Sequence, residues 1–172
     1  MPKEETKRKL ILREHALKES IKEGSAASAS AGLGSFYITP FALALNSSPF
    51  QIGLLSSFSG LAPPFAQLWG SKMMEEYTRK KIVTTFVLLE SLTWLIITTL
   101  AILFWKGIFQ EYLPYALIIL YSVLVSFGGM AYPAWFSWMG DIVPEKSRGK
   151  YFSKRNRITG AVSVIAVLTA AL

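Results

Sequence analysis

The stretch WFSWMGDIVPEKSRGKYF, Trp135 to Phe152, changes character at one residue. It is apolar and aromatic up to Gly140, turns acidic at Asp141, and then carries several cations. Trp side chains prefer the boundary between membrane and water, and cations gather on the cytoplasmic side of membrane proteins. We therefore interpret Asp141 as the point where a membrane-spanning helix emerges into water, with the following cations facing acidic lipid head groups.

Long segments without charge surround this stretch. No Asp, Glu, Lys or Arg occurs between Tyr112 and Gly140 or between Gly24 and Ser71, and residues 82–105 are interrupted only by Glu90. A helix needs about 20 apolar residues to cross the hydrocarbon core of a bilayer. The turn signal Asn46-Ser47-Ser48-Pro49 divides the first long segment in two. We predict four complete spans and the start of a fifth, at about 25–45, 50–69, 82–105, 113–139 and 158–172.

The predicted fold class is therefore all-α, a polytopic bundle of transmembrane helices. Residues 1–23 form a charged segment before a transmembrane region at 24–172. The charged segment is not a secretory signal, because its longest apolar run is Leu10 to Leu12 and a signal needs about 7 to 15 apolar residues. The absence of cysteine excludes a disulfide framework and a thiolate metal site.

The distribution of cations predicts the orientation. Of the 18 Lys and Arg residues, all except Lys106 lie in the N-terminal segment, between the second and third spans, or between the fourth and fifth. Alternate connections rich in cations are cytoplasmic by the positive-inside rule. We expect a multi-pass protein of the cell membrane with a cytoplasmic N-terminus. A nucleic-acid-binding protein would instead carry its basic residues on one folded surface, so we exclude nucleic acid as a partner.

Glu90 is the one ionisable side chain well inside a predicted span. A charge at such a depth costs about 3 kcal/mol on insertion scales, so the carboxyl group must be protonated, paired or beside water. Its functional interpretation is a relay for a proton or another cation. The alternative is a neutral carboxyl group that forms hydrogen bonds with hydroxyl groups of neighbouring helices.

Three tyrosines in the predicted spans are candidates for lining an aqueous cavity, namely Tyr37, Tyr121 and Tyr132. Phenol rings offer both a hydroxyl group and an aromatic face to a solute. Single polar residues in membrane helices also serve as hydrogen-bonding contacts between helices, which is the structural alternative.

Asp141 lies where the fourth predicted span ends, and a carboxylate opposes the dipole at the C-terminus of a helix. It therefore needs a cation, which Arg148 or Arg79 could supply, or it caps a new turn at Ile142 to Pro144. The sequence shows no nucleophile with a base, no histidine–carboxylate cluster and no phosphate-binding loop. We predict no enzymatic activity, no cofactor and no bound metal.

Two segments resemble the N-terminal portion of a major facilitator superfamily transporter. GSKMMEEYTRKK, from Gly70, is similar to the family's loop G-x-x-x-D-R-x-G-R-K between the second and third spans, with Met74, Glu75 and Tyr77 departing from that pattern. GDIVPEKSRGKYF, from Gly140, resembles the loop after the fourth span, D-x-x-P-x-x-x-R-G.

The resemblance implies a secondary transporter that moves a small solute by alternating access, with a proton or cation as coupling partner and the lipid bilayer as surroundings. It further implies a cytoplasmic gating latch, for which the candidates are Gly70, Arg79, Asp141 and Arg148. In the family the third span is peripheral, which argues against Glu90 as a solute ligand. Because family members have about twelve spans, we expect a fragment of a longer protein. The alternative function is a five-span membrane anchoring or interaction protein without transport activity.

Overall fold

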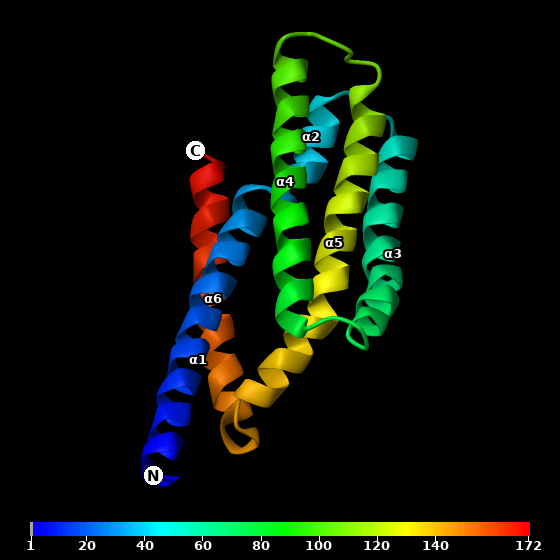
Figure 1. The fold of residues 1–172 in the computed structure, drawn as a ribbon. Coiled ribbons are helices and arrows are strands. Elements are labelled where there is room, and N and C mark those ends of the chain that lie inside the picture. Colours follow the sequence, from blue (N-terminus) through cyan, green and yellow to red (C-terminus); the bar gives the residue numbers. More distant parts are fainter. Residues whose placement is uncertain (1) are drawn as a thin grey trace. The chain divides into compact units, whose positions relative to one another are not determined.

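The computed structural model describes residues 2–172, with side chains described for Arg8 and from Leu10 onward (Figure 1). Helices account for nearly all of this range, and no strand occurs in it. The expected all-α fold is confirmed. The chain forms two compact units, one made of the residues up to Ile38 together with 139–172, and the other of residues 39–138.

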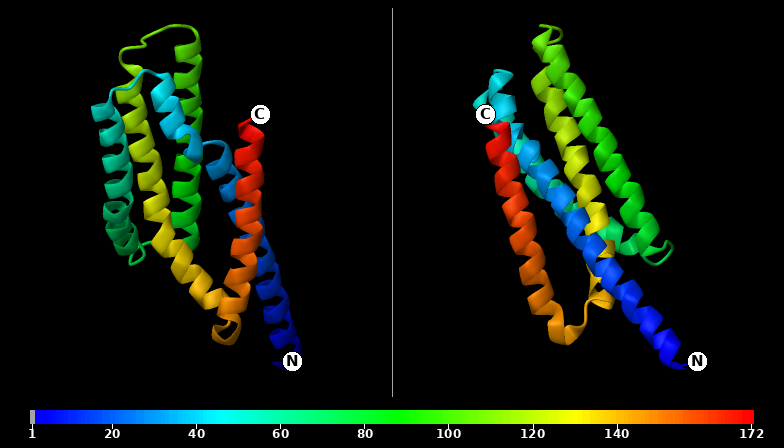
Figure 2. Two further views of the ribbon diagram at one scale, coloured as in Figure 1. Left: turned by 180° about the vertical axis from the view of Figure 1, so that it is seen from behind. Right: turned by 90° about the vertical axis from the view of Figure 1, so that its left-hand side faces the viewer.

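The first unit is built on two long helices, α1 (Pro2–Leu33) and α6 (Arg148–Ala170), with the short 3-10 helices Ser35–Tyr37 and Glu145–Ser147. The Tyr151 hydroxyl donates to the carbonyl of Leu17 over 3.1 Å, and the Tyr37 hydroxyl donates to the carbonyl of Val167 over 2.7 Å. Residue numbers rise together along both helices, so α1 and α6 are parallel (Figure 2). Helices that enter a membrane from the same side run in the same direction, as the predicted order of crossings requires.

Helix α1 continues without interruption through Gly24, so the charged segment and the first uncharged residues form one helix. Small side chains then occupy its last two turns. A Cβ atom added at Gly32 would lie 2.6 Å from the Cβ of Ala166 and 2.7 Å from the carbonyl oxygen of Ser163. The backbones of α1 and α6 therefore approach closely at Gly32, as small residues allow in membrane helices.

The second unit contains α2 (Ile38–Ala44), α3 (Pro49–Met73), α4 (Arg79–Trp105) and α5 (Leu113–Ile142), the last as far as Trp138. Helix α3 begins with a capping box, in which Gln51 N–H donates to Ser48 Oγ and Ser48 N–H donates to Gln51 Oε1. Thr78 caps α4 through the N–H of Lys81. These caps satisfy backbone donors that the first helical turn leaves without partners.

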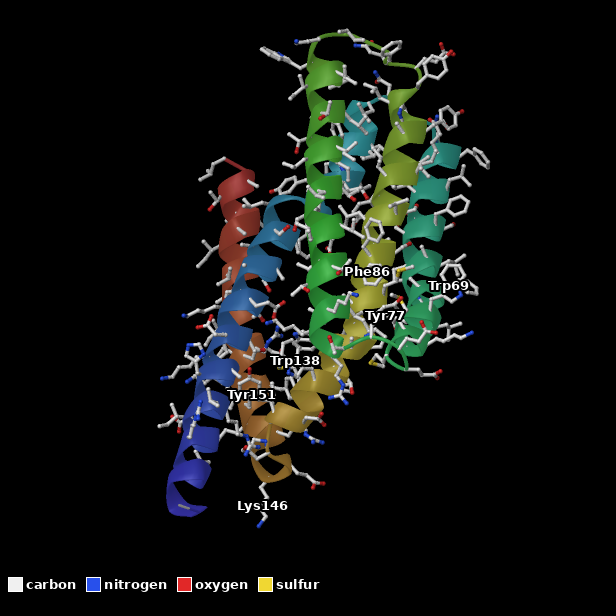
Figure 3. The ribbon with its side chains drawn as sticks, viewed as in Figure 1. Trp69, Tyr77, Phe86, Trp138, Lys146 and Tyr151 are labelled. Atoms are coloured by element: carbon white, nitrogen blue, oxygen red, sulfur yellow. The ribbon has the colours of Figure 1, made fainter. Side chains whose placement is uncertain are left out.

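Helix α5 packs against both α3 and α4. Ile82 and Phe86 of α4 form a buried cluster with Ala131 and Ala134 of α5, and the rings of Phe86 and Phe127 stack 6.1 Å apart. Figure 3 labels Phe86 on α4. On the α3 side, a Cβ atom added at Gly129 would lie 2.8 Å from the Pro63 carbonyl oxygen. Glycine at position 129 thus sets the distance between α3 and α5.

Two helices in residues 2–172, α4 and α5, are long and apolar enough to cross a membrane by length and composition. Large apolar side chains are also exposed on α3, among them Phe65, Leu68 and Trp69. The five spans expected from the sequence stay a prediction.

Replacing Gly129 with Ala should destabilise the second unit, because the new methyl group would overlap the backbone of α3 at Pro63. Overpacking of this kind costs about 1–3 kcal/mol. The measurement is the thermal unfolding midpoint in detergent. Gly60→Ala is the matched control, because nothing lies within 4 Å of a Cβ atom at that position. Equal midpoints for the two variants would contradict the packing argument.

Candidate functional site

One face of α5 carries two of the predicted cavity residues and a glycine between them. Tyr121, Gly128 and Tyr132 are separated by seven and four residues. At 100° per residue these positions fall within about 40° around the helix axis. The face is therefore a continuous stripe along α5, and we call these three residues the α5 face.

Glu90 of α4 lies against the middle of the α5 face. Its Oε2 atom is 3.5 Å from the position that a Cβ atom of Gly128 would occupy. The side chain is half-buried, and the carboxyl group has no hydrogen-bond or ion-pair partner within residues 2–172. The structure thus groups Glu90 with Tyr121 and Tyr132, three residues that the sequence assigned to two separate roles.

The two α5 tyrosines differ in their surroundings. Tyr121 is partly buried, and its hydroxyl group has no hydrogen-bond partner in the described part of the chain. Tyr132 is 51% exposed, and its ring stacks on Trp135 and Phe136 at centroid distances of 6.3 Å and 6.0 Å. Tyr121 is therefore a partly buried phenol, while Tyr132 belongs to an exposed aromatic cluster.

Tyr37, the third predicted cavity residue, belongs to the first unit. Its hydroxyl group is engaged with the α6 backbone at Val167. This contact is the structural alternative that the sequence left open for a single polar residue. The bond does not prevent the ring from facing a solute.

The predicted latch residues are divided between the units. In the second unit, Gly70 of α3 lies against the backbone of Met130, and Arg79 is the first residue of α4. In the first, Asp141 is an exposed residue at the end of α5, and Arg148 Nη2 donates to the carbonyl of Gly140 over 3.0 Å. Arg148 thus binds the end of α5 through a backbone carbonyl, and the latch as a whole stays a prediction.

Sequence reasoning missed a second arginine at the end of α5. Arg13 of α1 donates from Nε to the carbonyl of Ile142. The C-terminal end of a helix carries a partial negative charge, so guanidinium groups are favourable there. Together Arg13 and Arg148 supply donors to two terminal carbonyls of α5, and we call this arrangement the arginine clamp.

The spacing of residues in α1 could have indicated that Arg13 lies on a face that contacts another helix. Arg13, Leu17, Ser20 and Gly24 follow one another at four, three and four residues, which places them on one helical face. This face meets α6, where Arg155 Nε donates to the Ser20 carbonyl and Nη2 pairs with Glu23, each over 3.3 Å. Gly24 leaves the space that the Arg155 guanidinium occupies.

Glu19, Lys22 and His15 form a separate, exposed group on α1. Lys22 donates to Glu19 over 2.8 Å, and this bond lowers the pKa of the Glu19 carboxyl group below its usual range. His15 is 3.8 Å from the same carboxylate and is largely exposed. No group of three or more metal-ligating side chains occurs among the residues that the structure describes. The expectation of no bound metal is untested by this observation.

The sequence profile of the Major Facilitator Superfamily matches residues 24–172. The chain belongs to this superfamily. This match confirms the resemblance that the two loop motifs indicated. Members of the superfamily are membrane transport proteins and not enzymes. Comparisons with curated proteins and with solved structures gave no match.

Removing the arginine clamp should loosen the end of α5 without unfolding the protein. A hydrogen bond from a charged donor contributes about 1.5–3 kcal/mol, and the partial exposure of this site favours the lower value. We expect Arg13→Ala to lower the thermal unfolding midpoint in detergent and to speed amide hydrogen exchange near Ile142. Lys18→Ala is the control, because Lys18 is an exposed cation of the same helix. An unchanged exchange rate in Arg13→Ala would show that the clamp is not formed in solution.

Proposed function

We propose that the protein is a secondary active transporter that moves a small solute across the cell membrane by alternating access. Family membership supports transport in general. The more specific proposal rests on the position of Glu90 against Gly128, in the middle of the α5 face. A carboxyl group, a free phenol and an exposed aromatic cluster share that surface.

The position of Glu90 suggests coupling to a proton or another cation. A carboxylate in the hydrocarbon region is unfavourable by several kcal/mol unless it binds a proton, a cation or water. Among the side chains that the structure describes, none forms a hydrogen bond or ion pair that would fix the charge of Glu90, so we propose that its charge state changes during a transport cycle. A carboxyl group that gains and releases a cation is what coupling to an ion gradient requires.

The tyrosines suggest where the solute passes. Tyr121 and Tyr132 are eleven residues apart, or about 16 Å along the helix axis, and Glu90 approaches between them. A solute moving along the α5 face would exchange contacts with one phenol ring for contacts with the other. Tyr37 is the third residue that we propose for the cavity.

The cytoplasmic side carries the proposed gate. We propose that Gly70, Arg79, Asp141 and Arg148 belong to a cytoplasmic latch that opens as the transporter changes state. The sorting of cations supports a cytoplasmic N-terminus and places these loops on the same side. The family's usual latch arginine has Glu75 in its place here, so Arg79 is the candidate cation from that loop.

Glu90→Gln should separate coupling from passage of the solute. Glutamine keeps the size of the side chain and cannot release a proton or balance a cation. We expect accumulation driven by an imposed ion gradient to fall about tenfold or more, while exchange of labelled for unlabelled solute across the membrane persists. The measurement is uptake of radiolabelled sugars, amino acids and organic ions by vesicles that contain the protein.

The matched control is Ser91→Ala. Ser91 follows Glu90 in α4, is exposed, and donates its hydroxyl hydrogen bond to the Val87 carbonyl of the same helix. Undiminished accumulation by Glu90→Gln would make Glu90 a packing residue. Loss of exchange together with accumulation would instead place Glu90 in the solute site.

A further inference from the structure

A pocket of about 370 Å³ opens at the end of the second unit where the α2–α3 turn faces the connection between α4 and α5. Its walls come from two segments that are far apart in the sequence. The turn and the first residues of α3 supply Asn46 and Gln51. The other connection supplies Gln110 and Glu111, and the first turn of α5 supplies Tyr115. This end of the helices is opposite the predicted cytoplasmic loops, so the pocket faces the outside in the predicted orientation.

The polar groups of the pocket are held by the local backbone. The capping box fixes Gln51, whose Oε1 atom accepts the Ser48 N–H over 2.8 Å. The NH2 group of Gln51 thereby stays available to a ligand. Asn46 adopts a left-handed backbone conformation with φ of 57°, which Asn tolerates better than most residues. Buried Leu45, 4% exposed, forms an apolar part of the wall.

Electrostatics argues against a charged ligand. Glu111 is the only ionised side chain in the lining and contributes one negative charge. The N-termini of α3 and α5 both open here, and each carries roughly half a positive charge. The two N-termini therefore offset much of the carboxylate, and the C-terminal end of α2 at Ala44 adds back a partial negative charge. The remaining charge of the pocket is a fraction of one unit, which is a weak attraction for an ion.

The remaining chemistry suits hydroxyl groups. Three carboxamides supply both donors and acceptors, the carboxylate supplies acceptors, and Tyr115, which is 53% exposed, supplies a ring face. Hydrogen bonds of both senses beside an aromatic face match a ring whose edge carries hydroxyl groups and whose face carries C–H groups. The volume lies at the small end of the range for ligand sites, about 300–1,000 Å³.

We propose that this pocket is an external subsite that binds a neutral, hydroxyl-rich solute of monosaccharide size. Its place on a transport route rests on the proposed function, whereas binding itself does not. The subsite lies at one end of the second unit and uses neither Glu90 nor the α5 tyrosines at positions 121 and 132. Equilibrium binding therefore tests it separately from transport.

The test is saturation-transfer NMR on the protein in lipid nanodiscs, with glucose, choline and acetate as probes of a neutral polyol, a cation and an anion. We expect transfer to glucose, and we expect Tyr115→Ala to weaken glucose binding about fivefold because it removes the ring face. Glu111→Gln should retain glucose binding to within about threefold, because the amide still forms hydrogen bonds. Gln110→Ala should weaken it as well.

Tyr112→Ala is the matched control, because Tyr112 is a tyrosine of the same connection, 66% exposed, that does not line the pocket. Choline transfer that Glu111→Gln abolishes would replace the proposal by a cation site. Absence of glucose transfer, or glucose transfer that is equal in Tyr115→Ala and Tyr112→Ala, would overturn it. None of these results bears on ion-driven accumulation through Glu90.

Discussion

Close approach of helix backbones at glycine is the constraint on which the second unit depends. Lipid tails are as apolar as the helices, so the hydrophobic effect does not drive helices together within a bilayer, and association relies on packing and hydrogen bonds. Gly128 and Gly129 are adjacent in α5 and therefore point about 100° apart around its axis. Gly129 meets the backbone of α3 at Pro63, and Gly128 meets Glu90 of α4. This pair of glycines thus allows α3 and the Glu90 side chain of α4 to lie close to α5 on two different sides.

The first unit is held by a different kind of contact. Several long-range hydrogen bonds run from side chains to backbone carbonyls, from Tyr151 to Leu17, from Arg155 to Ser20 and from Tyr37 to Val167. A carbonyl oxygen has two lone pairs, so it can accept such a bond in addition to its helical partner. These contacts are spread along nearly the whole length of the α1–α6 pair. They fix the register of two parallel helices where small side chains alone would allow them to slide.

The sequence was sufficient for the fold class because that inference uses only composition along the chain. Uncharged runs and sorted cations predicted an all-α membrane protein, and the loop motifs at Gly70 and Gly140 indicated the family. Two helices are longer than the predicted spans: α4 begins at Arg79 and α5 continues to Ile142. Charged residues can extend a helix beyond the hydrocarbon core, whereas the predicted spans covered only the apolar residues. The α-helical conformation is interrupted by the 3-10 helix Ser35–Tyr37, which begins after Gly34. The sequence alone does not distinguish a glycine that interrupts a helix from one that allows close packing, so this interruption was not predicted.

The candidate site could not be predicted as a group because it depends on the register between helices. A rotation of α5 by one residue would move its surface by about 100° and separate Gly128 from Glu90. The family pattern argued against a direct role for Glu90, since the third span is peripheral in that pattern. Here the missing side chain at position 128 leaves the Glu90 carboxyl group against α5, beside the stripe that carries Tyr121 and Tyr132. A helix can therefore bring a carboxyl group close to a neighbouring helix where that neighbour carries glycine, and the absence of a side chain at Gly128 is what allows Glu90 to approach the α5 face that we propose for the solute.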